Sequence, residues 1–468
     1  MNTESEGKNQ GEQGELIRAL SKQLEEKERA NQILLAQLAA NEARFEEITG
    51  SLGWQLVNRY SWMKYYFSTV YRLLGLLLGQ NVKAQTVHPL TKRPASVFPP
   101  PSTYDVICFP IINWNFRFQR PQQLLTQFAN AGHRVFYLST TFDQSGASIL
   151  AQNIAENIYE IQLPGPAHVS LNMHKIDEQV LESLLGALDE FRRRAGIADA
   201  TSLVHLPFWG PLAIEARKRW DWKLVYDCMD EHSGFSNNRR TMLRPERALI
   251  KYSDLVIATS RILYDKVSSG GRKALLLPNA VDFDYFHRPG PLRPLDGIPR
   301  PIIGYYGAIS DWFDVKMIRK AAAARPDWHF VLIGDTAGAN VSPLKRLNNV
   351  HLIGEQPYIT LPSYLKQFDV ACIPFLITCL TRATNPVKFY EYLSLGKPIV
   401  AVELPDLEPY RDYFYPVRSI ADFVPQIEAA LSERSPEKVQ ARIEFARQNT
   451  WLDRYKILSE NIEQCEKG

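Results

Sequence analysis

Apolar and polar residues alternate regularly from residue 104 onward. Short apolar runs follow one another with longer amphipathic stretches between them. This order predicts parallel strands joined by helices. The pattern runs to about residue 288 and indicates one doubly wound domain over 103–290. The expected strands are 105–109, 134–138, 203–206, 224–226, 255–258 and 275–277, and the expected helices include 121–129 and 176–194.

The same alternation restarts after residues 288–301, whose prolines and glycines are typical of an interdomain hinge. A second, smaller domain is expected over 291–432, followed by C-terminal helices over 433–468. The fold class is therefore α/β, with two Rossmann-like doubly wound domains. In the second domain we expect strands at 302–305, 329–333, 350–352, 370–373 and 398–402, with helices beginning at Val315 and Val387.

Residues 15–52 have a different pattern, in which apolar residues recur at steps of three and four. This heptad spacing predicts a coiled coil over 1–52, and Asn31 on the apolar stripe is typical of a residue that fixes helix register. A single amphipathic helix packed on its own chain is the alternative. The stripe consists of Ile17, Leu20, Leu24, Leu34, Leu38, Phe45, Ile48 and Leu52.

Residues 53–102 combine an aromatic, cation-bearing segment with a Pro-rich linker. Seven aromatic residues between Trp54 and Tyr71 are interleaved with Arg59, Lys64 and Arg72. Such a mixture suits a membrane interface, but it equally suits a helix packed on the following domain, and the sequence leaves both alternatives open. The polar, acidic N-terminus is unlike a secretory signal. We therefore expect a cytoplasmic protein, with peripheral contact at the inner face of the plasma membrane as the first of these alternatives.

Bulk composition excludes several classes of protein. The 468 residues carry a net charge of +3, so the sequence lacks the strongly basic balance of a nucleic-acid binder. Five scattered cysteines, with no CxxC pair and no nearby His cluster, are expected to be reduced thiols without structural zinc. We expect no metal and no cofactor.

Residues 385–400, with the sequence NPVKFYEYLSLGKPIV, carry the most specific pattern. Pro386 suits the first turn of a helix, and the free N–H groups of a helix N-terminus attract phosphate. Lys388 lies in that turn, shortly after Arg382. Glu391 follows one turn later, where a carboxylate can accept hydrogen bonds from ribose hydroxyls. A structural helix with an ordinary Lys–Glu pair is the alternative.

This segment resembles the donor-binding helix of the retaining GT-B glycosyltransferases, in particular glycosyltransferase family 4 with its group 1 domain. The resemblance implies that Glu391 binds the nucleotide ribose. Many members carry a further Glu that contacts the sugar, at the position where this chain has Ala383. The chain is similar instead to a branch with the pattern NPxKxYEYLxxGKP, for which the resemblance implies that Arg382, Asn385 and Lys388 contact the diphosphate and sugar.

The resemblance covers most of residues 104–430. Residues 303–310 (IGYYGAIS) resemble the first strand and loop of the donor domain, and 351–358 (HLIGEQPY) resemble the loop that binds the base. Where most members place Arg and Lys shortly after the first loop, this chain has DWFDVK at 311–316. The implied donor-binding residues are Gly307, Ala308, Gly354, Tyr358, Asn385, Lys388 and Glu391.

In the first domain, residues 226–235 (YDCMDEHSGF) follow an apolar strand and place two acids and a histidine at its carboxyl end. These groups can orient an acceptor hydroxyl, although a structural loop network is the alternative. Residues 118–124 (FQRPQQL) resemble the family's first helix. The expected catalytic residues are Asp230, His232, Arg382 and Lys388, and the expected acceptor-binding residues are Trp114, Arg117, Arg120 and Glu231.

The implied reaction moves a sugar from a nucleoside-diphosphate sugar to a hydroxyl of a glycan or lipid-linked glycan, with retention. Cations and helix N-termini would neutralise the departing diphosphate. Residues 51–56 (SLGWQL) resemble a segment that precedes some glycosyltransferases of polysaccharide assembly. Two alternatives stay open at this point: a nucleotide-sugar 2-epimerase of the same fold, and a non-catalytic coiled-coil scaffold with a relic fold.

The heptad pattern generates a prediction about assembly. The full chain should form a homo-oligomer through residues 15–52, whereas a chain that begins at Ser102 should be monomeric, because only the first carries the apolar stripe. Sedimentation equilibrium of both proteins measures the masses. Two monomers would contradict the coiled coil.

Overall fold

The computed structural model describes residues 88–89, 98–101, 103–143, 149–165, 175–234, 242–269 and 273–465. The predicted coiled coil (1–52) and most of the segment 53–102 lie outside these residues, so self-association and membrane contact stay predictions. No helix among the described residues is long and apolar enough to cross a bilayer.

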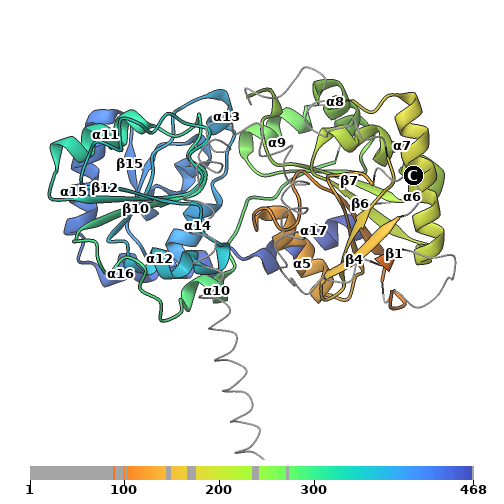
Figure 1. Ribbon diagram of the computed structural model, residues 1–468, viewed down its shortest axis with the longest axis horizontal. Helices are drawn as coiled ribbons and strands as arrows, with labels where there is room; N and C mark the ends of the chain where they lie inside the picture. The colour runs from red at the N-terminus through yellow and green to blue at the C-terminus, as the bar shows by residue number, and fades with distance from the viewer. Residues whose placement is uncertain are drawn as a thin grey trace, which may run out of the picture. The chain divides into compact units, whose positions relative to one another are not determined.

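The first domain is built on a nine-stranded sheet (Figure 1). Its strands are parallel except that β4 pairs antiparallel with both of its neighbours. Strands β2, β3, β6 and β8 are buried along their whole length, which explains why they stand out in the sequence as short apolar runs. In spatial order the strands are β1 (His88–Pro89), β4 (Leu150–Ala155), β5 (Ile158–Gln162), β3 (Val135–Leu138), β2 (Asp105–Phe109), β6 (Ala200–Val204), β7 (Lys223–Cys228), β8 (Leu255–Ala258) and β9 (Ala274–Leu276).

The helices of this domain begin and end where side chains can cap them. In α6, for example, the Asp177 carboxylate accepts a hydrogen bond from the Val180 amide, and Gly196 ends the helix in the left-handed conformation. The helices are α5 (Arg120–Asn130), α6 (Glu178–Ala195), α7 (Gly210–Trp220), α8 (Leu243–Tyr252) and α9 (Arg261–Ser268), with short 3₁₀ turns η1 (Pro207–Trp209) and η2 (His232–Gly234).

The second domain is a six-stranded, fully parallel sheet with the strand order of a Rossmann fold. The order reverses between β10 and β13, and ligands of such sheets bind at the carboxyl ends of the strands at this point. The strands are β12 (Val350–Gly354), β11 (His329–Ile333), β10 (Ile302–Tyr306), β13 (Val370–Ile373), β14 (Ile399–Val402) and β15 (Tyr415–Val417). The helices are α11 (Val315–Ala324), α12 (Leu361–Gln367), α13 (Cys379–Arg382), α14 (Val387–Ser394), α15 (Phe423–Ser432) and α16 (Pro436–Arg447), with 3₁₀ turns η4 (Tyr358–Thr360), η5 (Pro405–Tyr413) and η6 (Ile420–Asp422).

The chain passes between the two domains twice, at adjacent places. It leaves the first core after Ala280 and enters the second core at Val281, ahead of α10 (Phe283–His287). Val281 pairs with Thr450, where the chain returns. The last helix, α17 (Trp451–Glu463), then packs beside α5 in the first domain (Figure 1). The Pro-rich segment 288–301, expected to be the hinge, instead buries Leu295 in the second core.

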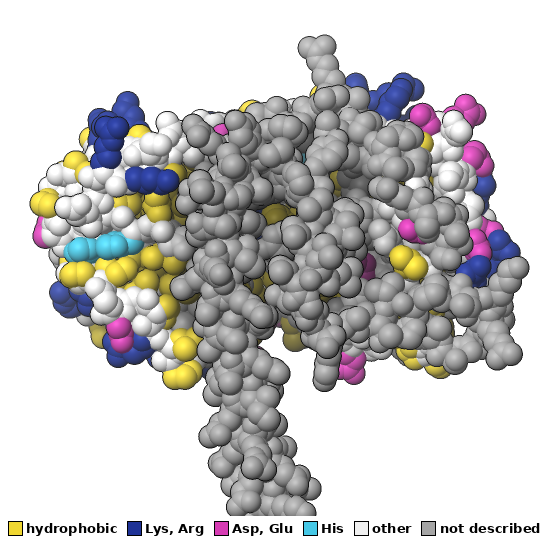
Figure 2. All heavy atoms as spheres, in the orientation of Figure 1, with side chains coloured by type: hydrophobic (Ala, Val, Ile, Leu, Met, Phe, Trp, Pro, Cys, Tyr) yellow, Lys and Arg dark blue, Asp and Glu magenta, His cyan; other side chains and the backbone are white. Residues whose placement is uncertain are grey.

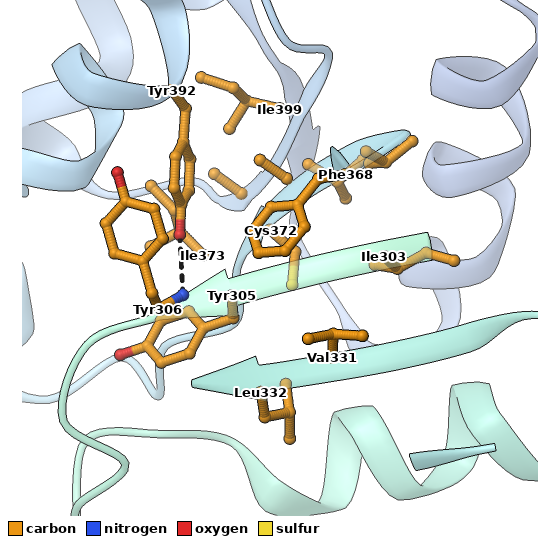
Figure 3. Packing of buried hydrophobic residues seen from close by; sticks show 14 of the residues in the cluster. Ile303, Tyr305, Tyr306, Val331, Leu332, Phe368, Cys372, Ile373, Tyr392 and Ile399 are labelled. Atoms are coloured by element: carbon orange, nitrogen blue, oxygen red, sulfur yellow. Dashed lines mark hydrogen bonds between the residues drawn. The ribbon is translucent and has the colours of Figure 1, made fainter. Parts of the chain in front are cut away.

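The core of the second domain depends on close packing at β10. A Cβ atom added at Gly304 would overlap the ring of Phe368, which lies across the strand (Figure 3). At the end of the same strand, the Tyr306 amide donates a hydrogen bond of 3.2 Å to the Tyr392 hydroxyl of α14. This contact ties the second turn of α14 to the carboxyl end of β10.

This packing predicts opposite effects for two Gly→Ala variants. Gly304→Ala should lower the free energy of unfolding by about 1–3 kcal/mol, because Phe368 must move to admit the methyl group. Gly186→Ala, on the exposed face of α6 where nothing lies within 4 Å, should raise it by about 0.5–1 kcal/mol. Urea denaturation of each variant measures the change. A Gly304→Ala protein as stable as the wild type would contradict the packing described.

Candidate functional site

One glycine follows the carboxyl end of each of the strands β10 and β11. Gly307 has φ +128° and Gly334 has φ +151°, conformations that residues with a Cβ rarely adopt. A Cβ at Gly334 would also overlap the Gly307 carbonyl oxygen, so the two strand ends are in direct backbone contact. The structure thus places Gly307 at a bare strand end, and the approach of a diphosphate to its backbone stays a prediction. Gly334, which lies beside it, was not identified from the sequence. The result is an edge of bare backbone at the topological switch point.

Lys388 projects from the first turn of α14 onto this edge. Its Nζ atom would lie 3.3 Å from a Cβ placed at Gly307. The ammonium lies 5.4 Å from the centre of the Tyr305 ring and 5.0 Å from that of Phe375. Burial lowers the pKa of Lys388 to about 8, and the nearby Glu391 opposes the shift. Among the described residues Lys388 forms no ion pair within 4.0 Å. Its ammonium can therefore bind an anionic ligand.

Glu391 lies one turn further along α14 and is almost completely buried. Burial raises the pKa of its carboxyl to about 7, and the neighbouring Tyr306 hydroxyl and Lys388 ammonium oppose the shift. At neutral pH the carboxyl is therefore close to half-ionised, and it can accept hydrogen bonds from hydroxyl groups of a ligand. Tyr306 was not identified from the sequence as part of this group.

Asn385, immediately before α14, is fully engaged by protein groups. Its Oδ1 accepts a hydrogen bond of 2.9 Å from the Asn279 amide, and its carbonyl accepts one of 2.6 Å from the Asn279 side chain. Its Nδ2 donates to the Tyr390 hydroxyl and to Asp406. Asn385 thus joins the second domain to the first, and the adjacent Arg382 on α13 is exposed.

The remaining donor-side residues follow β10 and β12. Gly354 ends β12 with φ +80°, and Ala308 accepts a hydrogen bond of 2.9 Å from the Tyr305 hydroxyl. The Tyr358 ring stacks on Tyr285 at 5.7 Å, and its hydroxyl accepts a hydrogen bond of 2.8 Å from Gln123 of α5. Tyr358 is therefore held by aromatic and polar partners that include the first domain.

In the first domain, the acids and histidine that follow β7 have different environments. Burial, followed by repulsion from Asp227, raises the pKa of Asp230 to about 6. Burial lowers the pKa of His232 to about 4, so its imidazole is neutral at pH 7. The Glu231 carboxylate accepts hydrogen bonds from the Ser233 hydroxyl and from Lys266, whose Nζ lies 3.1 Å away. Lys266, on α9, was not identified from the sequence.

The structure brings this β7 loop close to the segment before α14. A Cβ added at Gly234, at the end of η2, would lie 2.9 Å from the Cβ of Leu380 on α13. The residues Asp230 to His232 and the cations Arg382 and Lys388 are therefore carried by neighbouring segments of the two domains. Among the described residues no group of three or more His, Cys, Asp or Glu could hold a metal.

The three expected acceptor residues around α5 have unlike surroundings. Trp114 is buried and packs on Tyr137 at 5.3 Å. Arg120 is also buried, and it donates to Asp227 at 2.8 Å and to the Leu277 carbonyl at 3.0 Å. Arg117 reaches the second domain instead, where Glu355 accepts its Nε–H at 2.6 Å.

Over the described surface visible in Figure 2, basic side chains are interspersed with acidic and apolar ones.

Comparison with known proteins identifies relatives for both the sequence and the fold. Residues 300–433 match the family model Glycosyl transferases group 1. TuaH of Bacillus subtilis (strain 168), named as a glycosyltransferase of teichuronic acid biosynthesis, is 29% identical over 256 residues, which cover 50% of this chain and 64% of TuaH. This chain therefore spans a little under two thirds of that relative.

Two solved structures show that the fold is GT-B. Sucrose-phosphate synthase from Thermosynechococcus elongatus matches with a TM-score of 0.60 at 15% identity, over 77% of this chain and 99% of the other. HepE of Anabaena, solved in complex with UDP and glucose, matches with a TM-score of 0.58 at 14% identity, over 77% and 100%.

The buried Glu391 predicts a pH effect on stability. Between pH 4.5, the ordinary pKa of the carboxyl, and its raised value of about 7, the unfolded chain releases a proton that the folded protein keeps. Stability is therefore lost as pH rises through this window and stays lower above it. The loss is on the order of 3 kcal/mol.

The measurement is urea denaturation at a series of pH values from 4.5 to 7.5. Glu391→Gln, which has no such proton, should lose less stability over this range than the wild type. Glu182→Gln, which changes an exposed carboxylate on α6, should follow the wild type. Parallel curves for Glu391→Gln and the wild type would rule out a costly buried carboxylate.

Proposed function

Through its second domain this chain belongs to the group 1 glycosyltransferases, and we propose that it moves a sugar from a nucleoside-diphosphate sugar to a hydroxyl acceptor with retention of configuration. The observation that carries the proposal is Lys388, a half-buried cation held against the Gly307 edge at the switch point of the donor sheet. A diphosphate supplies the negative charge that this position lacks. Its developing charge in the transition state would be stabilised by the same ammonium.

On the donor side, each predicted residue has a distinct role in the proposal. The backbone at Gly307 and Ala308 admits the diphosphate, and Lys388 and the exposed Arg382 neutralise it. Glu391 accepts hydrogen bonds from the ribose, and the segment from Gly354 to Tyr358 holds the base. Asn385 acts by positioning, since its amide is engaged by Asn279 and fixes the start of α14. We keep Arg382 and Lys388 as the catalytic cations.

On the acceptor side, we propose that Asp230 and His232 orient the incoming hydroxyl. With a pKa of about 6, Asp230 is ionised at neutral pH and close to the value that suits proton exchange. His232 is neutral there and can accept or donate one hydrogen bond. We keep Glu231, which accepts hydrogen bonds from Ser233 and Lys266, as an acceptor-binding residue beside them in the chain. Because Trp114 and Arg120 are buried, we assign them to positioning the loop and Asp227.

The class of substrate follows from the relatives. TuaH is named for teichuronic acid biosynthesis, and HepE was solved with UDP and glucose. We therefore propose that the donor is a uridine-diphosphate sugar and that the acceptor is a growing polysaccharide or its lipid-linked precursor. No resident cofactor or metal enters the proposal. The predicted aromatic segment over 53–80 would hold the protein near such a lipid-linked acceptor.

The donor site predicts how binding responds to two lysine variants. Lys388→Met should weaken UDP binding by at least tenfold, because the diphosphate loses its buried cation. Lys397→Met is the matched control: burial also lowers the pKa of Lys397 to about 8, but Lys397 precedes β14 at the opposite edge of the sheet and donates to the Lys366 and Phe368 carbonyls. Isothermal titration of the full chain with UDP measures both affinities.

Glu391→Gln should also weaken UDP binding, by about 1.5–3 kcal/mol, through loss of charge-assisted hydrogen bonds. The wild type should gain roughly 2.7 kcal/mol of stability at a UDP concentration of a hundred times its dissociation constant. A wild type that binds none of the common nucleoside diphosphates would overturn the proposed function. Equal losses for Lys388→Met and Lys397→Met would place the anion elsewhere.

A further inference from the structure

Arg117 is a cation of the first domain that lies among the strand ends of the second sheet. It lies in the loop between β2 and α5, and the Gln122 side chain fixes this loop by donating to the Arg117 carbonyl at 2.7 Å and to the Trp114 carbonyl at 3.1 Å. The guanidinium extends to Glu355, after β12, and to Asp335, after β11, at 2.6 and 3.8 Å. The Arg117 backbone is thus fixed by the Gln122 side chain, and its guanidinium is held by two carboxylates of the second domain.

The same guanidinium lies beside the loop that follows β10, because its partner Asp335 accepts a backbone hydrogen bond of 2.8 Å from the Ile309 amide. In this loop the Ala308 carbonyl accepts a hydrogen bond from the Tyr305 hydroxyl, and the Tyr305 ring lies beside the Lys388 ammonium. Burial raises the pKa of Tyr305, and among the charges that oppose the shift is Arg117. Arg117 and Lys388 therefore approach the end of β10 from two domains.

Both cations assigned to the proposed donor so far come from neighbouring helices of the second domain. A nucleoside-diphosphate sugar carries two negative charges on its diphosphate, and Arg382 and Lys388 lie on α13 and α14. The loop that follows β10, residues 307–314 (GAISDWFD), contains two aspartates and no basic residue. A cation on the β11 side of this loop must therefore come from another segment, and Arg117, which pairs with Asp335 after β11, is already oriented toward it.

We infer that Arg117 is a ligand of the donor diphosphate, supplied across the domain boundary, and that Glu355 and Asp335 hold it in the unliganded protein. This inference rests on the proposed function and adds to it a residue of the first domain that contacts the donor. On binding, the guanidinium exchanges its carboxylate partners for phosphate oxygens. The donor then connects both domains through a single group.

The chemistry favours such an exchange. The side chains of Glu355 and Asp335 are 47% and 39% exposed, and ion pairs with such exposed partners contribute little to stability. A diphosphate offers oxygens on two phosphorus atoms to the planar fork of an arginine, which matches phosphate in a bidentate manner. The two carboxylates keep the Arg117 side chain extended, but they bind the guanidinium too weakly to prevent it from turning to the phosphate oxygens.

The inference predicts opposite effects for the two partners of one ion pair. In the full chain, Arg117→Gln should weaken UDP binding by about tenfold or more while leaving the affinity for uridine, measured by competition, little changed. Arg117→Lys should recover part of the loss. Glu355→Gln should strengthen UDP binding severalfold, because Arg117 is released from its competitor. If the pair only locked the domains together, both variants would shift UDP affinity in the same direction.

A double variant separates release of the arginine from simple repulsion. In Arg117→Gln/Glu355→Gln, the gain due to Glu355→Gln should shrink or vanish, since no arginine remains to be released. A gain of undiminished size would mean that Glu355 merely repels phosphate, and this result would overturn the exchange. UDP affinity unchanged in Arg117→Gln, with the wild type binding UDP, would overturn the inference alone. Absence of UDP binding in the wild type would instead count against the proposed function.

Discussion

The proposed donor site depends on a cation that is kept half-buried without a carboxylate partner in contact. Removing an ammonium from water is costly, and the usual response is to pair it or to lower its pKa. Here burial lowers the pKa of Lys388 to about 8, and partial compensation comes from the nearby Glu391 carboxyl and from the aromatic faces of Tyr305 and Phe375. The protein can fold with this cation unpaired, and an anion that binds to the ammonium would stabilise the folded state further.

The position of that cation is set from outside its own helix. Asn385 bonds the backbone and side chain of Asn279, which lies at the crossing between the domains. Arg120 donates to the Leu277 carbonyl and to Asp227 of β7. The returning chain adds Arg454 of α17, whose guanidinium donates to the Pro278 carbonyl at 3.0 Å. The crossing is thus held by polar side chains from three other segments, and α14 begins directly beside it.

The sequence predicts the parallel strands well because they are buried on both faces. The ranges 255–258, 329–333 and 370–373 coincide with β8, β11 and β13. The hairpin of β4 and β5 was missed, because β4 lies near the edge of the sheet and is mostly half-exposed, so its residues show no apolar run. The short edge strand β15 was missed for the same reason. Local pattern also gave no indication that α17 returns to the first domain.

At the site, residue types were easier to predict than partners. The motif identifies Lys388 and Glu391 because their spacing on a helix is local information. It cannot distinguish a ligand from a structural amide, and Asn385 has protein partners for every group of its side chain. Arg120 looked like an available cation in the sequence, but its partner Asp227 lies 107 residues away. Gly334 is likewise required by its own φ of +151° and by the Gly307 carbonyl that lies opposite it, and neither is visible in the local sequence.

These observations give the motif at 385–391 two physical tasks that cannot be separated. Asn385 ties the start of α14 to Asn279, and Lys388 and Glu391 follow at fixed spacing on the same helix. A displacement at the crossing therefore moves the ammonium and the carboxyl as a rigid pair relative to the Gly307 edge. Asn279 also accepts a hydrogen bond from Arg120, which in turn donates to Asp227 of β7. One chain of hydrogen bonds therefore runs from Asn385 to Asp227, and the charge of Asp227 contributes to the raised pKa of Asp230. The acid that would orient the acceptor and the cation that would bind the donor are thus carried by segments that share this network, and a shift of either segment strains the same hydrogen bonds.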